Sequence, residues 1–141
     1  MLAARADINV RTKENVTPLI TSLDMACGKP EISLALIRAG ADVNVVESDG
    51  DTALWIATTE SSLEVMKELL SKGANPNVQA RGGDTPLHLA ASNGLPDRAE
   101  LLLQYGATTT IRNTQGQTPL EIVTQKSPET TDILNKYSHR Q

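Results

Sequence analysis

The chain has 141 residues, a formal net charge of -4 and 39% apolar residues, a size and composition that suit about one domain with its own core. Phe is absent and aromatic residues make up only 2% of the chain, so Leu, Ile, Val and Ala must do nearly all of the packing. No three basic residues are consecutive and no stretch of eighteen apolar residues occurs, which argues against nucleic acid as a partner and against insertion into a membrane.

The amino-terminal segment and the cysteine content bear on the compartment. Residues 1–10, MLAARADINV, lack the cationic segment and the apolar stretch of a signal peptide. Cys27 is the only cysteine, and it cannot form an internal disulfide or a metal site by itself. We therefore expect a cytoplasmic protein, with a nuclear location or secretion as an effector as the alternatives.

Four short helices are predicted, each beginning at a threonine. Their starts are Thr17-Pro18-Leu19, Thr52-Ala53-Leu54, Thr85-Pro86-Leu87 and Thr118-Pro119-Leu120, spaced 35, 33 and 33 residues apart. A threonine hydroxyl accepts a hydrogen bond from a backbone N–H of the first helical turn, and proline is tolerated in that turn because it lacks an N–H. Alanines on the apolar sides of these segments favour close packing between successive helices.

A second helix is predicted after each of the first. Three of the second helices begin at a proline: Pro30, Pro96 and Pro128. In the remaining unit Ser61, with Glu64 three residues later, resembles a capping box. Gly73 and Gly106 follow apolar helix ends, and glycine is free to take the left-handed conformation that turns the chain.

Glycines also mark tight turns between the helix pairs. Gly50, Gly83 and Gly116 each stand two residues before a helix-starting threonine, and they predict the tips of short hairpins. A Gly-Ala pair recurs with the same period of 33 residues at 40–41, 73–74 and 106–107. A fixed period of this length predicts stacked units, each of which buries its apolar face against its neighbours.

The run TPLHLAASNG at residues 85–94, LLLQYGA at 101–107 and the glycine turn before the next TPL together resemble the ankyrin repeat. The similarity covers residues 4 to about 135. It implies an all-α solenoid of stacked helix-turn-helix pairs, with short β-hairpin or turn fingers and a concave face formed by the finger tips and the first helices. We expect a single domain, residues 1–141, with a partial repeat at 1–10 and repeats at about 11–45, 46–78, 79–111 and 112–141.

The chain departs from the repeat pattern in three places. The first full unit is two residues longer, with the insertion around residues 24–29, where we expect an extended turn. Where His88 stands in the third unit, the other units carry different residues: Ile20, Trp55 and Glu121. The chain starts partway through a repeat, so we expect apolar surface at that end. We predict a monomer, with stacking of this surface on a second copy or an omitted repeat as the alternative.

Residue types that carry catalysis lack partners in this sequence. His139 is the only other histidine besides His88, and in the family the matching histidine ties its own threonine to neighbouring backbone, so we assign His88 a structural role. Cys27 has no histidine in its own repeat. Asp49-Gly50-Asp51 lacks the ligand spacing of a calcium loop. We therefore predict no enzyme, no metal and no cofactor.

The resemblance implies that the chain binds another protein or peptide through positions that the repeat leaves free. On the fingers, the solvent side of the first helices and one second-helix end, these positions are Lys13, Glu14, Met25, Asp49, Asp51, Glu60, Arg81, Asp84, Ser92, Asn93, Tyr105, Gln115 and Gln117. Trp55 has two interpretations, as an anchor for the partner or as a packing residue in the histidine position. Acidic residues such as Glu47 and Glu64 in the second unit favour a partner with a basic segment, and an ordinary solvated face is the alternative.

Two further hypotheses follow from the resemblance. Residues 36–44 are similar to a site that an asparaginyl hydroxylase modifies in animal ankyrin domains, at Asn44; the alternative is that Asn44 only supports its turn. The implied function is a scaffold or adaptor that binds a partner through the concave face. The alternative is an ankyrin-repeat segment of a larger protein, such as a channel, a kinase or an effector, whose activity lies outside these residues.

Overall fold

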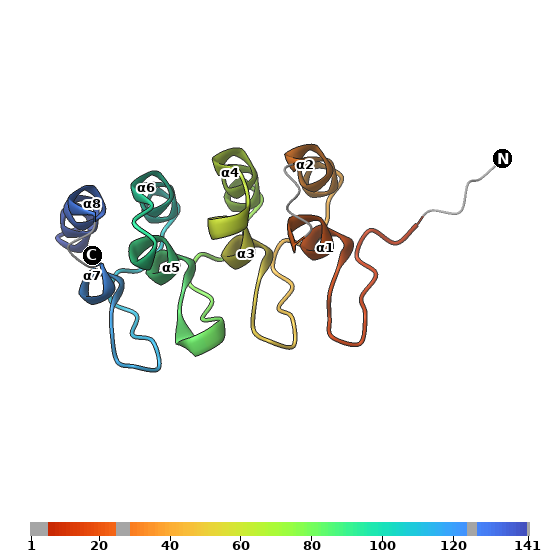
Figure 1. The fold of residues 1–141 in the computed structure, drawn as a ribbon. Helices are drawn as coiled ribbons and strands as arrows, with labels where there is room; N and C mark the ends of the chain where they lie inside the picture. The colour runs from red at the N-terminus through yellow and green to blue at the C-terminus, as the bar shows by residue number, and fades with distance from the viewer. Residues whose placement is uncertain (1–5, 25–28, 124–126, 141) are drawn as a thin grey trace.

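The structure is a computed structural model that describes residues 6–24, 29–123 and 127–140. Within these residues the helices form four pairs: α1 (Pro18–Asp24) with α2 (Pro30–Arg38), α3 (Ala53–Glu60) with α4 (Leu63–Ser71), α5 (Pro86–Ser92) with α6 (Pro96–Gln104), and α7 (Pro119–Ile122) with α8 (Pro128–Ser138). The pairs stand side by side in chain order, with the first helices in one row and the second helices in another (Figure 1). The predicted all-α solenoid is confirmed.

A loop projects from the start of each first helix, away from the row of second helices (Figure 1). We call these loops fingers 1 to 4, residues 11–16, 46–51, 79–84 and 112–117. Each is closed by the same two backbone bonds; in finger 2, Glu47 N donates to Asp51 O and Gly50 N donates to Glu47 O, both at 2.9 Å. The residue equivalent to Gly50 in finger 1 is Asn15, which takes the same left-handed conformation at φ 66.

The fingers are turns more than hairpins. In the part of the chain that the structure describes, strand pairing is confined to one isolated antiparallel bridge, between Val46 and Thr52. Finger 3 contains a short 3₁₀ turn, η1 (Arg81–Gly83). The predicted turn fingers are therefore present, and most of the expected β-pairing is absent from the described residues.

The predicted threonine starts are confirmed at all four first helices. Each threonine hydroxyl accepts the backbone N–H three residues later, from Ile20, Trp55, His88 and Glu121 in turn. Such a cap stabilises a helix by about 0.5–2 kcal/mol. Helices of only four to eight residues are marginal by themselves, so these caps fix where each first helix begins and hold its finger at a constant position.

The second helices begin as predicted at three of four sites, with proline in the first turn of α2, α6 and α8. The start of α4 differs by one residue: the cap is Ser62, whose side chain accepts from Val65 N, and the predicted cap Ser61 is wrong. The reason is that Ser61 N still donates to Ala57 O at 3.3 Å and so closes the last turn of α3. A new helix can therefore begin only one residue later.

Thin aliphatic layers between the pairs form the core. Leu19, Leu54 and Leu87 on the first helices are no more than 1% exposed, and so are Leu69 and Leu102 on the second helices. Burying a leucine side chain contributes about 1.5–3 kcal/mol. The first helices contact one another along the row, as do the second helices, so each pair stabilises the next.

The predicted extended turn of the first unit lies outside the described residues, and the division of the repeats at residues 45, 78 and 111 stays a prediction.

Candidate functional site

His88 is fully buried and joins its own helix to the next finger. Its Nε2 lies 2.9 Å from Gln117 O, while Nδ1 accepts Thr85 N at 3.1 Å and lies 2.8 Å from Thr85 Oγ1. Both ring nitrogens are therefore occupied by hydrogen bonds within the stack. The structural role predicted for His88 is confirmed, and the ring offers no free nitrogen to a substrate or a metal.

Asn44 holds one repeat to the next. Its Oδ1 accepts Asn75 N at 2.8 Å and its Nδ2 donates to Gly73 O at 2.9 Å. Asn77 makes the equivalent pair of bonds to the following unit, so the turn-supporting interpretation accounts for both asparagines. Asn44 is nevertheless exposed. Its hydroxylation stays a prediction, which mass spectrometry of the native protein tests.

The tips of the fingers are exposed. They are formed by the two residues that stand four and three positions before each helix-starting threonine: Lys13, Glu14, Ser48, Asp49, Arg81, Gly82, Thr114 and Gln115. Four predicted residues outside the tips are also exposed: Glu60, Ser92, Asn93 and Tyr105. Asp84 and Gln117 are half-buried and used within the stack, because Asp84 Oδ1 accepts Asn113 Nδ2 at 2.8 Å and Gln117 O lies against His88. Met25 lies outside the described residues.

The position expected for Asp51, free at a finger tip, is wrong: this residue is only 3% exposed. It stands directly before the capping Thr52, where the finger returns to the helix, and its backbone oxygen accepts Glu47 N. Its Oδ2 lies 3.0 Å from Arg81 Nη2, and the same guanidinium nitrogen lies 3.1 Å from Asp49 Oδ2. Arg81 therefore bridges a buried and an exposed carboxylate.

Four carboxylates contribute negative charge around finger 2. We call them the acidic cluster: Asp24, Glu47, Asp49 and Asp51. Partial burial raises the pKa of Glu47, and the other three carboxylates raise it further, while Arg81 opposes them. Burial likewise raises the pKa of Asp51 against the lowering effect of Arg81. The sequence pattern does not predict Asp24 as a site residue. It lies at the end of α1, in the preceding unit, and the 33-residue period alone does not bring it here.

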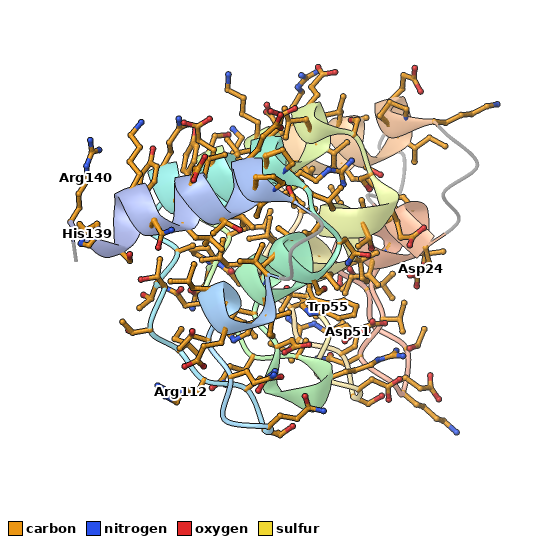
Figure 2. The ribbon with its side chains drawn as sticks, turned by 60° about the vertical axis from the view of Figure 1, so that its left-hand side comes forward. Asp24, Asp51, Trp55, Arg112, His139 and Arg140 are labelled. Atoms are coloured by element: carbon orange, nitrogen blue, oxygen red, sulfur yellow. The ribbon has the colours of Figure 1, made fainter. Side chains whose placement is uncertain are left out.

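Trp55 lies on α3 beside this cluster and is half-buried against the core. Figure 2 shows it with Asp51 where the finger meets the helix. Among the described residues, two buried side-chain atoms lack a hydrogen-bond partner, Trp55 Nε1 and Asp51 Oδ1. The packing interpretation of Trp55 thus has support in the structure, and its role as a binding anchor stays a prediction.

Apolar surface is exposed at the amino-terminal end of the row, as the sequence predicts. A groove of about 790 Å³ is lined only by residues between positions 10 and 36. Val10 and Ile32, which line it, are each 56% exposed. A smaller hollow of about 300 Å³, which includes Glu60, lies between the first two helix pairs.

The comparisons with known proteins agree with this geometry. A family model described as ankyrin repeats (3 copies) matches residues 1–80, and one described as ankyrin repeats (many copies) matches residues 69–123. The chain belongs to the ankyrin repeat family. Ankyrin repeats are generally protein–protein interaction modules without enzymatic activity. No curated protein matches the chain.

Two features of the described residues bear on other classes of function. They contain no group of three or more His, Cys, Asp or Glu side chains placed to hold a metal ion. In the same part of the chain, every helix falls short of the length and apolarity that crossing a membrane requires.

Proposed function

We propose that this chain is a non-catalytic module that binds another protein through the side formed by the finger tips and the first helices. One observation carries the proposal: the two tip positions are exposed in every finger, and their chemistry differs from finger to finger. Fingers 1 and 2 present Lys13-Glu14 and Ser48-Asp49, whereas fingers 3 and 4 present Arg81-Gly82 and Thr114-Gln115.

Most side chains that support the fold lie outside these tips, although Arg81 pairs with Asp49 and Asp51 and the Thr114 hydroxyl donates to Gly82 O. The polar groups of the capping threonines, of His88 and of the turn asparagines form hydrogen bonds within the stack. A surface whose scaffold is fixed by one set of residues leaves the other set available for recognition. We therefore propose a scaffold or adaptor role, with the chain as a monomer in the cytoplasm.

Affinity capture followed by binding measurements with the purified partner tests the proposal. A tip variant combines Glu14→Ala, Ser48→Ala and Gln115→Ala, and a matched variant combines Lys67→Ala and Gln104→Ala on the exposed faces of α4 and α6. We expect the tip variant alone to weaken binding of the captured partner, by about tenfold or more if a tip residue is a hot spot. A partner lost by the second-helix variant and retained by the tip variant contradicts the proposed surface.

A further inference from the structure

Neighbouring fingers are joined by backbone hydrogen bonds at two of the three junctions. Between fingers 1 and 2, Ser48 N donates to Glu14 O at 3.0 Å. Between fingers 3 and 4, Thr114 N donates to Gly82 O at 2.9 Å. The donors and acceptors occupy equivalent positions in the repeat, so these bonds are part of the regular construction of the stack.

The junction between fingers 2 and 3 is held differently. Its equivalent atoms are Arg81 N and Asp49 O, and no hydrogen bond joins them in the described part of the chain. The Arg81 guanidinium instead reaches back to Asp49 and Asp51. The Arg81 side chain is 62% exposed, so this junction is held by a solvent-exposed side chain and not by the backbone.

Asp51 has also lost a partner that its counterpart keeps. In the next repeat Asp84 Oδ1 accepts Asn113 Nδ2 across the junction. The residue equivalent to Asn113 at the junction of fingers 2 and 3 is Ala80, which carries no side-chain donor. Asp51 Oδ1 is therefore buried without a partner, and an unpaired buried carboxylate oxygen is costly.

Trp55, on helix α3, also lacks a hydrogen bond that the equivalent residue of the next repeat makes. At the equivalent position His88 donates from Nε2 to Gln117 O, whereas Trp55 Nε1 is buried with no acceptor within reach. One junction thus lacks a backbone bond and carries both an unused acceptor and an unused donor. The hydrogen-bond pattern of the repeat fails at this junction and holds at the next one. Such a departure from the regular pattern is expected at a functional site.

The charge around this junction is also uncompensated. Besides burial, Asp24, Asp51 and Asp49 raise the pKa of Glu47, and Asp49 and Asp24 raise the pKa of Asp51, while Arg81 lowers both. Asp49 keeps 65% of its side chain exposed, so a further cation can approach its carboxylate from solvent. Trp55 beside it is half-buried, and an aromatic ring attracts a cation positioned over its face.

We propose that the junction of fingers 2 and 3 receives an arginine or lysine side chain from a protein partner. The cationic head group pairs with the exposed carboxylate of Asp49 and adds to the single guanidinium, that of Arg81, which balances the buried carboxylate of Asp51. The half-buried Trp55 lies beside this position. A guanidinium matches carboxylates best, because its donors form a fixed planar fork. The inference rests on the proposed function, since it names the chemistry of the partner at one point of the same surface.

Fluorescence of Trp55, the only tryptophan in the chain, reports directly on the site. The 141-residue chain is titrated with acetylated tetra-arginine amide and with the tetra-citrulline peptide, in which each guanidinium is replaced by a neutral group of the same shape. We expect a saturable fluorescence change with tetra-arginine that weakens as salt shortens the range of charge interactions. Tetra-citrulline should give none. An equal response to the two peptides overturns the inference.

A matched pair of variants separates this site from general attraction between charges. Asp49→Asn and Asp132→Asn each remove one exposed carboxylate, from finger 2 and from α8 respectively. We expect Asp49→Asn to weaken tetra-arginine binding by about threefold to fivefold, the scale of a partly exposed ion pair, and Asp132→Asn to leave it unchanged. Equal weakening by both variants overturns the inference.

The result is independent of the tip variant of the proposed function, which leaves Asp49, Asp51, Trp55 and Arg81 intact. A partner that depends on the tips but shows no preference for arginine at this junction removes the inference alone. Selective arginine binding with no dependence of the partner on the tips removes the proposed surface and leaves the arginine site standing.

Discussion

The imidazole Nε2 of His88 donates a hydrogen bond to the backbone oxygen of Gln117, 2.9 Å away. Because a carbonyl oxygen can only accept, the proton must sit on Nε2, and Nδ1 is then the acceptor for Thr85 N and for the Thr85 hydroxyl. The neutral ring thereby satisfies one acceptor and two donors across a repeat junction. A single side chain fixes the start of α5 and the base of finger 4 together.

His88→Ala should lower the free energy of unfolding by about 2–4 kcal/mol, because it leaves several buried polar groups unpaired at once. Urea denaturation followed by circular dichroism measures the effect. His139→Ala, at the exposed end of α8, is the control and should change stability by less than about 0.5 kcal/mol. Similar losses for the two histidines would mean that the bonds of His88 contribute little.

Ala80→Asn should stabilise the junction of fingers 2 and 3. The new amide occupies the position that Asn113 has in the next repeat, and its Nδ2 can donate to Asp51 Oδ1 as Asn113 does to Asp84. We expect a gain of about 0.5–1.5 kcal/mol, the net worth of one hydrogen bond, measured as the shift of the urea midpoint. Ala80→Asp has nearly the same shape but adds a carboxylate beside Asp51 and should destabilise. Equal effects of the two substitutions would refute the explanation.

The sequence predicts most of the fold because its signals are local. Thr85 caps α5 and Pro96 begins α6 through contacts that span only a few residues, and such contacts can be read from spacing alone. The exception, the start of α4, shows the limit. Ser61 and Ser62 are chemically equal as caps, and the choice between them depends on whether Ser61 N still bonds to Ala57 O, which the pattern does not specify.

The candidate site is less predictable because its properties depend on residues one repeat away. Asp51 looks like a free finger residue in the sequence, yet it is buried, its Oδ2 pairs with Arg81 and its Oδ1 lacks a partner because residue 80 is alanine. The sequence does contain a signal for the last point. Aligning the units by their threonines places Ala80 opposite Asn113, but only the structure shows that Asn113 donates to Asp84.

Gly82→Ala and Gly83→Ala should differ in cost although the two glycines are adjacent in finger 3. Both have left-handed backbone, at φ 68 and φ 74, and an alanine there costs about 1–2 kcal/mol. A Cβ at Gly82 meets nothing within 4 Å, whereas a Cβ at Gly83 would lie 2.9 Å from Thr114 N. Gly83→Ala must therefore also push finger 4 away. Urea unfolding should show the larger loss at Gly83, and equal losses would show that finger 4 moves freely.

The acidic cluster should make stability fall as pH rises above the ordinary carboxyl range. Burial and the neighbouring carboxylates raise the pKa of Glu47, so the folded state holds this proton more tightly than the unfolded state does. The resulting stabilisation is complete below the unfolded pKa and is lost as pH rises through the folded pKa.

The pKa of Glu121 is shifted in the opposite direction. Its hydrogen bond from Thr118 N, assisted by Arg112, lowers its pKa, so its contribution is present above the unfolded pKa and is lost as pH falls.

Glu47→Gln and Glu121→Gln therefore form a matched pair with opposite expected outcomes. Relative to the unchanged chain, Glu47→Gln should gain stability between about pH 4 and pH 7, across the range where an ordinary glutamate loses its proton. Over the same interval Glu121→Gln should lose stability, because the unchanged chain gains the charged contacts that the variant lacks. Urea unfolding at both pH values measures the two differences. A Glu47→Gln variant that loses stability or does not change over this interval would show that the carboxylates around finger 2 do not repel one another, and the surplus of negative charge there would then be no reason for a cation to bind.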